Sequence, residues 1–237
     1  MYKEIRVLVI IPAFNEEKTI RKVIRQVKDA FSIVDIIVIN DGSKDNTYKE
    51  ALKENVYVIN LPFNLGIGGA MQTGYLFAKN KNYDIAIQVD ADGQHDPKFI
   101  EKLIEPLLAD SSDMVIGSRY AQPSLYKSTF WRRLGIIYFA NFITLLINQR
   151  LTDTTSGFRA VNKNVIDYFA CCYPLDFPEV DVLIRLYNRR FRIIEIPVEM
   201  NTRAEGKSSI RSLKSIYYMV KVSLAIIINS LRAEKYS

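Results

Sequence analysis

The sequence predicts an α/β fold in which a mostly parallel β-sheet is flanked by helices. Short β-branched apolar runs alternate with longer amphipathic segments, and each apolar run ends in a polar cluster. Such alternation is typical of right-handed βαβ crossovers. Ligands of these sheets gather at the carboxyl ends of the strands. We therefore expect the polar clusters to form one shared site.

The first predicted strand covers residues 6–12, a β-branched apolar run typical of a strand buried on both faces. Asn15 then follows as the expected N-cap of a helix. The apolar stripe of that helix recurs at spacings of three and four residues, at Ile20, Val23, Ile24, Val27 and Phe31.

The same cycle repeats along the first half of the chain. Further strands are predicted over residues 35–40, 56–61, 84–89 and 113–117. Helices are predicted over residues 47–54 and 67–79, and another begins at Pro97, which suits the first turn of a helix. The polar clusters at the strand ends are Asn15-Glu16, Asp41-Gly42-Ser43, Asp90-Ala91-Asp92 and Ser118-Arg119.

Beyond about residue 120 the pattern changes. We expect an apolar helix over 134–147, polar loops over 153–160 and 174–181, a strand over 192–198 and a long helix over 210–231. No linker or repeat interrupts this half. We therefore predict one domain over residues 1–209 and a C-terminal amphipathic helix extension over residues 210–237.

Composition limits the classes of partner. A chain of 237 residues fits one large domain, and its net charge of +6 suits a phosphate-bearing ligand or an anionic membrane surface. The basic residues are dispersed and not striped with aromatics, so we expect no nucleic acid partner. Two adjacent cysteines build no disulfide framework, and a single histidine excludes a His-rich metal cage. The strand-like start predicts no signal peptide, and no apolar run securely predicts a membrane span.

Asp90 and Asp92 directly follow a predicted strand. Two carboxylates at this spacing can face one ligand and form a hard oxygen site suited to Mg²⁺ or Mn²⁺ bridging two phosphates. Gln94 could add a neutral oxygen. The alternative is a solvated acidic turn.

Two further motifs, at residues 41–46 and 66–70, each allow a ligand-binding and a purely structural interpretation. Asp41 could accept hydrogen bonds from a nucleotide base or ribose, whereas turn and N-cap chemistry is the alternative, with Asp45 or Asn46 as the cap. The glycines of residues 66–70 resemble a phosphate loop only weakly, because they do not follow the first strand. We favour close helix packing for them.

Several cations have no obvious partner nearby in the sequence. Arg119 ends the fifth predicted strand, and Arg132 and Arg133 follow. Guanidinium groups bind phosphate oxygens bidentately, so these residues could receive a phosphate. Arg203 and Lys207 lie in a basic loop that could close over a diphosphate.

Seven short motifs together carry a resemblance to a known family. They occupy residues 12–17 (PAFNEE), 41–47 (DGSKDNT), 64–66 (NLG), 90–95 (DADGQH), 117–120 (GSRY), 155–159 (TSGFR) and 203–208 (RAEGKS). In this order they resemble family-2 glycosyltransferases of the GT-A fold, on the branch of dolichol-phosphate mannose synthase and bacterial polyprenyl-phosphate glycosyltransferases. The resemblance covers roughly residues 5–210.

The resemblance implies a role for each matching position. The residues that it implies for binding the nucleotide sugar are Pro12, Phe14, Glu16, Ile39, Asp41, Asp90, Ala91, Asp92, Arg203 and Lys207. The metal would lie at Asp90, Asp92 and Gln94, and the acceptor phosphate at Arg119 with Arg132 or Arg133. The residues implied to be catalytic are Asp92, Arg119 and Arg203. The departures from the family pattern are Phe14 for Tyr, Asn40 for Asp, Ile136 for Ser and Ser209 for Lys.

The function that the resemblance implies is a metal-dependent, inverting hexosyltransferase. It would move a sugar from a nucleotide-diphosphate sugar, with a UDP-sugar favoured and GDP-mannose open, to undecaprenyl or dolichyl phosphate for cell-envelope polysaccharide or glycan synthesis. Transfer to a sugar hydroxyl is the alternative, and it needs a carboxylate base, for which Asp153, Glu179 and Asp181 are candidates. A non-catalytic nucleotide-sugar-binding subunit of a membrane complex is the second alternative.

The C-terminal helix indicates where the protein acts. Its apolar side and the basic residues within and after it suit a helix in an anionic bilayer interface, and Lys221 in its middle disfavours a span. These basic residues are Lys214, Lys221, Arg232 and Lys235. We therefore expect a peripheral protein on the cytoplasmic face of the cell membrane. Helices packed on the sheet are the alternative. The sequence leaves open a small membrane-protein partner or a homo-oligomer.

Overall fold

A computed structural model describes residues 5–121, 138, 140–146, 149–175 and 178–201. The strands are β1 (Val7–Ala13), β2 (Asp35–Asn40), β3 (Tyr57–Asn60), β4 (Ile85–Gln88), β5 (Met114–Ser118), β6 (Arg159–Asn162) and β7 (Ile193–Pro197). The helices are α1 (Ile20–Ala30), α2 (Thr47–Leu52), α3 (Gly66–Asn80), the 3₁₀ turn η1 (Pro97–Phe99), α4 (Ile100–Leu108), α6 (Lys163–Cys172) and α7 (Pro178–Asn188).

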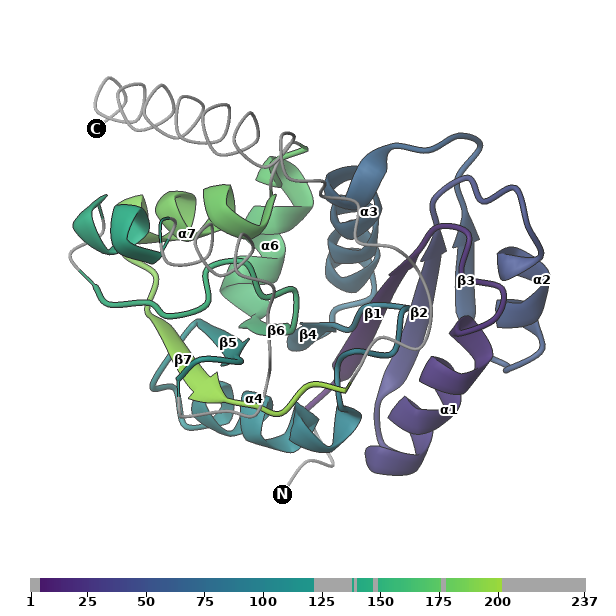
Figure 1. Cartoon of the computed structure of the whole chain (residues 1–237), viewed down its shortest axis with the longest axis horizontal. Helices are drawn as coiled ribbons and strands as arrows, with labels where there is room; N and C mark the ends of the chain where they lie inside the picture. The colour runs from purple at the N-terminus through teal and green to yellow at the C-terminus, as the bar shows by residue number, and fades with distance from the viewer. Residues whose placement is uncertain (1–4, 122–137, 139, 147–148, 176–177, 202–237) are drawn as a thin grey trace.

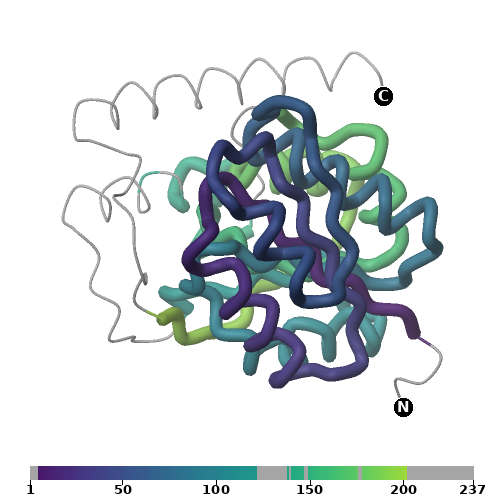
Figure 2. The backbone as a smooth tube through the Cα atoms, turned by 90° about the vertical axis from the view of Figure 1, so that its right-hand side faces the viewer, coloured from purple at the N-terminus to yellow at the C-terminus, as the bar shows by residue number. Residues whose placement is uncertain are grey.

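The strands form one sheet in the order β3-β2-β1-β4-β6-β5-β7. Four neighbouring pairs are parallel, and β6 alone runs antiparallel to its neighbours β4 and β5. The predicted mostly parallel sheet is confirmed. Figure 2 views the molecule from the β3 edge, with the N-terminal half nearest to the viewer.

Helices cover both faces of the sheet (Figure 1). Successive residues of β1 point to opposite faces: Leu8 and Ile10 pack with α3, α6 and α7, whereas Val9 and Ile11 pack with α1 and α4. All four side chains are fully buried. This two-sided burial explains why β1 is apolar at successive positions and has no polar alternation.

Three local expectations were wrong. The predicted polar loop 153–160 ends in β6, and the predicted loop 174–181 contains the start of α7. Asn15 does not cap α1, because its φ is +56° and α1 begins later, after Thr19. Asn is among the few residues that adopt this left-handed conformation readily.

One further expectation was confirmed, and others lie outside the described residues. Residues 140–146 are helical, as predicted for the apolar stretch. No helix among the described residues is long and apolar enough to cross a membrane. Residues 202–237, with the predicted interfacial helix, are outside the described part of the chain, and the domain boundary at 209 stays a prediction.

The glycines at the start of α3 allow close packing, as predicted. A Cβ atom built on Gly68 would lie 2.4 Å from the carbonyl oxygen of Leu175 and 2.5 Å from that of Pro174. Both atoms belong to backbone, which cannot move aside as a side chain can.

Gly68→Ala should therefore destabilise the protein by about 1–3 kcal/mol, as overpacking does. In a free helix the same change stabilises by roughly 0.5–1 kcal/mol, so the sign of the effect is informative. Urea unfolding of the two proteins measures it. A more stable variant would show that α3 does not approach this backbone.

Candidate active site

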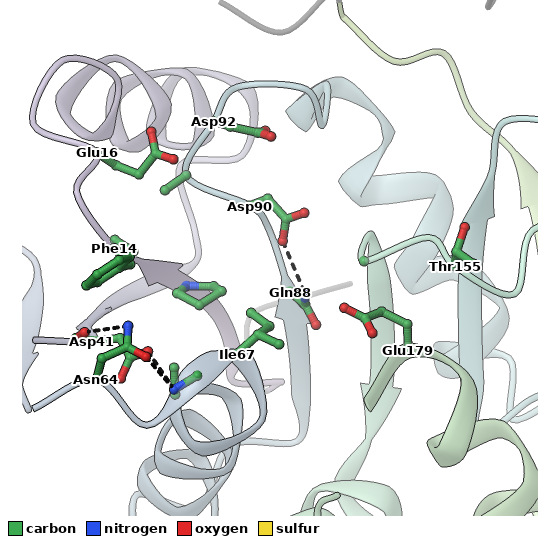
Figure 3. Close-up of a pocket in the computed structure, with 16 residues that line it drawn as sticks. Phe14, Glu16, Asp41, Asn64, Ile67, Gln88, Asp90, Asp92, Thr155 and Glu179 are labelled. Atoms are coloured by element: carbon green, nitrogen blue, oxygen red, sulfur yellow. Dashed lines mark hydrogen bonds between the residues drawn. The ribbon is translucent and has the colours of Figure 1, made fainter. Parts of the chain in front are cut away.

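A cleft of about 390 Å³ opens at the carboxyl ends of β1, β2 and β4 (Figure 3). This volume is within the range of small-molecule sites. The residues that line it are Pro12, Ala13, Phe14, Glu16, Asp41, Asn64, Gly66, Ile67, Ala70, Gln88, Asp90, Ala91, Asp92, Thr155, Gly157 and Glu179. The predicted convergence of the strand ends is therefore present, since Asp41 and Asp92 share one cleft.

Most of the residues predicted to bind the nucleotide sugar are brought together here, namely Pro12, Phe14, Glu16, Asp41, Asp90, Ala91 and Asp92. Ile39 is not, because it is fully buried in the core that β2 forms with α3. Gln94 is not among the lining residues either, and its backbone N–H donates to Asp92 Oδ1 at 3.0 Å. Arg132, Arg133, Arg203 and Lys207 lie outside the described residues.

The loops after β1 and β2 hold one another in place. The backbone N–H of Asn15 donates to Ser43 Oγ at 2.9 Å, and its side-chain Oδ1 accepts from the Lys44 N–H at 2.9 Å. The Glu16 N–H donates to Thr47 Oγ1 at 2.7 Å. These bonds between two loops fix the wall of the cleft that carries Phe14, a residue that is 45% exposed.

Asp41 anchors the start of α3. Its two carboxylate oxygens accept the backbone N–H groups of Leu65 at 2.7 Å and Gly66 at 2.9 Å. An acidic side chain is favourable there because the N–H groups of the first helical turn lack helical partners. Each oxygen keeps a second acceptor position for a ligand, so the nucleoside role stays a prediction. Of the two expected caps of α2, Asn46 occupies the N-cap position without a side-chain hydrogen bond, and the Asp45 carboxylate accepts from the Thr47 N–H at 2.9 Å.

The Asp90 carboxylate is oriented from two sides. Gln88 Nε2 donates to Asp90 Oδ1 at 3.1 Å, and His95 Nε2 lies 3.5 Å from Asp90 Oδ2. The Asp90 backbone N–H donates to His95 Nδ1 at 3.0 Å, which assigns the hydrogen of a neutral imidazole to Nε2. His95 is buried and stacks on Phe158, with 4.8 Å between ring centroids. Sequence reasoning missed both Gln88 and His95 as supports of this carboxylate.

The cleft is strongly acidic. Five of its lining residues carry carboxyl groups, and none of those in the described part of the chain is Lys or Arg. A phosphate-bearing ligand would need a cation to offset this charge. Asp90 and Asp92 offer the hard oxygen ligands that Mg²⁺ or Mn²⁺ prefers. The described residues hold no group of three or more His, Cys, Asp or Glu suited to a metal. A pair of carboxylates suits an Mg²⁺ ion that takes further ligands from substrate phosphates.

The three candidate bases differ in their burial, in their ion pairs and in whether they line the cleft. Asp153 is fully buried and paired with Arg119, and Asp181 pairs with Arg185 at 2.9 Å. Only Glu179 among them lines the cleft. Burial raises the pKa of the Glu179 carboxyl, and the negative charge of Asp90 adds to this shift.

Arg119 has a partner in the fold that sequence reasoning did not find. Its Nε donates to Asp153 Oδ2 at 2.6 Å and its Nη2 to Asp153 Oδ1 at 2.7 Å. Nη2 also donates to Thr155 Oγ1 at 3.1 Å, which ties Arg119 to a residue of the cleft wall. No partner lies near Arg119 in the sequence, as expected, because Asp153 is 34 residues away along the chain. Its acceptor role stays a prediction.

Comparison with known proteins agrees with this geometry. Residues 8–169 match the family model of glycosyl transferase family 2. A UDP-N-acetylglucosamine–dolichyl-phosphate N-acetylglucosaminyltransferase of Methanococcus voltae is 36% identical over 179 residues, which are 68% of this chain and 70% of the relative. A polyprenol monophosphomannose synthase of Mycolicibacterium smegmatis is 29% identical over 92% of this chain and 86% of its own.

The fold has a match among solved structures. Glucosyl-3-phosphoglycerate synthase of Mycobacterium tuberculosis, in complex with Mn²⁺, UDP and phosphoglyceric acid, superposes with a TM-score of 0.73. The match covers 97% of this chain and 79% of that one, at 21% sequence identity, and it bears on the GT-A fold alone. From the family model and the relatives together, the chain belongs to glycosyl transferase family 2, on the branch of the polyprenyl-phosphate sugar transferases.

Proposed function

We propose that this glycosyltransferase moves a sugar from a nucleotide-diphosphate sugar to a polyprenyl phosphate on the cytoplasmic face of the membrane. The observation that carries the proposal is the acidic cleft, where Asp41, Asp90 and Asp92 meet at the strand ends. The relatives named above support the lipid acceptor, and a UDP-sugar is the favoured donor.

The proposed donor site divides along the cleft. Phe14 presents an exposed ring on which a nucleotide base can stack, and Asp41 keeps acceptor positions for the base or ribose. Asp90 and Asp92 would hold Mg²⁺ or Mn²⁺ beside the diphosphate. When bound, that cation would offset the charge that grows on the leaving nucleotide diphosphate.

The acceptor needs positioning and no general base, because a polyprenyl phosphate is already anionic near neutral pH. Arg132 and Arg133 remain proposed ligands of that phosphate, and Arg203 and Lys207 remain proposed ligands of the donor diphosphate. Arg119 would act from a fixed position, since Asp153 holds two of its nitrogens.

Metal removal gives the test of this proposal. The full chain is incubated in detergent with undecaprenyl phosphate, Mn²⁺ and a radiolabelled donor: UDP-glucose, UDP-N-acetylglucosamine or GDP-mannose. One donor should yield a lipid-linked monosaccharide. Excess EDTA should lower the rate at least about a hundredfold, because the charge on the leaving group is no longer offset, and added Mn²⁺ should restore it. Equal rates with and without EDTA would contradict the proposed metal dependence.

A second candidate function is transfer to a sugar hydroxyl. It is favoured by Glu179, which lines the cleft with a raised pKa as a general base requires. Oligosaccharide acceptors in the same assay distinguish the two functions. If only the oligosaccharides receive sugar and undecaprenyl phosphate does not, the acceptor is a glycan and not a lipid.

A further inference from the structure

One end of the cleft is formed by residues from the end of β4, the loop before β6, and α7. They are Gln88, Asp90, Thr155, Gly157 and Glu179. In Figure 3, Glu179 points from α7 toward Gln88, beside which the Asp90 carboxylate lies. Glu179 and Thr155 lie across the cleft from Phe14 and Asp41, with Asp90 between the two sides (Figure 3).

The position of this end relative to the strands indicates which part of the donor it contacts. If the nucleoside lies at the ends of β1 and β2 and the diphosphate lies at the end of β4, the sugar extends toward β6, the next strand of the sheet. Glu179, Thr155 and Gly157 are the lining residues on that side. This step rests on the proposed function.

The shape of this end depends on Gly157. A Cβ atom built there would lie 2.9 Å from Gln88 Nε2 and 3.1 Å from Asp90 Oδ2. A side chain at position 157 would have to displace the Gln88 amide and would crowd the Asp90 carboxylate, so glycine leaves both groups in their present places. The wall beside Asp90 is therefore set by backbone.

The chemistry of this end favours a sugar that donates hydrogen bonds. Two carboxyl groups, Asp90 and Glu179, line it, and no Lys or Arg among the described residues does. Carboxylate oxygens accept from hydroxyl groups, whereas a second carboxylate nearby is repelled. Burial raises the pKa of Glu179, and the charge of Arg159, whose Nη2 donates to the Glu179 carbonyl oxygen at 2.6 Å, acts against this rise.

We propose that Glu179 is a specificity-determining residue for the donor: its carboxyl accepts a hydrogen bond from a hydroxyl of an uncharged sugar and disfavours a uronate. Asp181, two residues further along α7, provides the matched comparison. It is also acidic, but it pairs with Arg185 and does not line the cleft.

Calorimetry with the full chain and Mn²⁺ tests this proposal. The probes are UDP, UDP-glucose and UDP-glucuronate, with GDP, GDP-mannose and GDP-mannuronate as the second series. The wild type should prefer the hexose to the uronate of the series whose nucleotide it binds. In Glu179→Gln, hexose affinity should fall about tenfold, the difference between a charged and a neutral hydrogen bond. The preference over the uronate should largely disappear, and affinity for the bare nucleotide should stay within about twofold.

Each other outcome contradicts a defined part of the account. Unchanged hexose affinity in Glu179→Gln, or an equal fall in Asp181→Asn, would overturn the role of Glu179. If Glu179→Gln keeps its hexose affinity but has a lower kcat in the sugar-transfer assay, the role in specificity is also overturned, and Glu179 is assigned to base catalysis. If the wild type binds neither UDP nor GDP, the proposed function fails, and the inference fails with it.

Discussion

Asp92→Asn should lower kcat/KM for sugar transfer by about a hundredfold to a thousandfold, the range seen when one electrostatic contact to developing charge is removed. Asparagine keeps an oxygen that can accept the Gln94 N–H, as Asp92 Oδ1 does at 3.0 Å, so the turn should survive. The negative charge that attracts the cation would be lost. Steady-state kinetics across Mn²⁺ concentrations measure the effect, and partial recovery at high Mn²⁺ is expected.

The control for this change is Asp96→Asn. Asp96 lies four positions away and caps η1 by accepting the Lys98 N–H at 3.1 Å, but it does not line the cleft. Asparagine is an equally good cap. We expect activity near that of the wild type. An equal loss in both variants would mean that the whole turn, and not the Asp92 charge, sets the rate.

Asp153→Asn should lower the free energy of unfolding by about 3–5 kcal/mol, the usual result of breaking a buried ion pair from one side. Asp153 is fully buried and Arg119 is 6% exposed, so the arginine would lose a buried carboxylate partner at a place with little access to water. Urea unfolding followed by circular dichroism measures this loss. Because Arg119 also donates to Thr155 in the cleft wall, donor affinity should fall in the variant that remains folded.

An exposed ion pair of the same length provides the comparison. Arg192 Nη2 lies 2.6 Å from Asp110 Oδ1, the same separation as Arg119 Nε to Asp153 Oδ2, but the Asp110 side chain is 86% exposed. Asp110 has a φ of +51°, which asparagine also adopts readily. Asp110→Asn should therefore leave the free energy of unfolding nearly unchanged. Equal destabilisation by the two variants would show that burial does not determine the strength of the Arg119 pair.

The first half of the fold could be predicted because its signals are local. The strand over Asp35–Asn40 has its predicted bounds, and β1 was displaced by one residue. The prediction failed at β6, which is four residues long and ends in Asn162, the cap of α6. This strand forms because it pairs with β4 and β5. Four residues are too few for a hydrophobic pattern that would predict this pairing.

The acidic part of the site could be predicted for a similar reason. Asp41, Asp90 and Asp92 directly follow predicted strands, and the topology of a parallel sheet brings such ends together. Thr155 and Gly157 precede an unpredicted antiparallel strand, so nothing local assigned them to the cleft. The pairing of Arg119 with Asp153 likewise depends on tertiary structure. The two residues are far apart in the sequence, so neither indicates its partner.

A crystal structure of the protein with Mn²⁺ and the nucleotide diphosphate that it binds would test the central claim most directly. The anomalous signal of manganese locates the ion independently of the surrounding density. We predict one manganese peak within coordination distance of Asp90 or Asp92, with the base beside Phe14 and Asp41. A nucleotide bound without manganese at these carboxylates, or bound outside this cleft, would contradict the account.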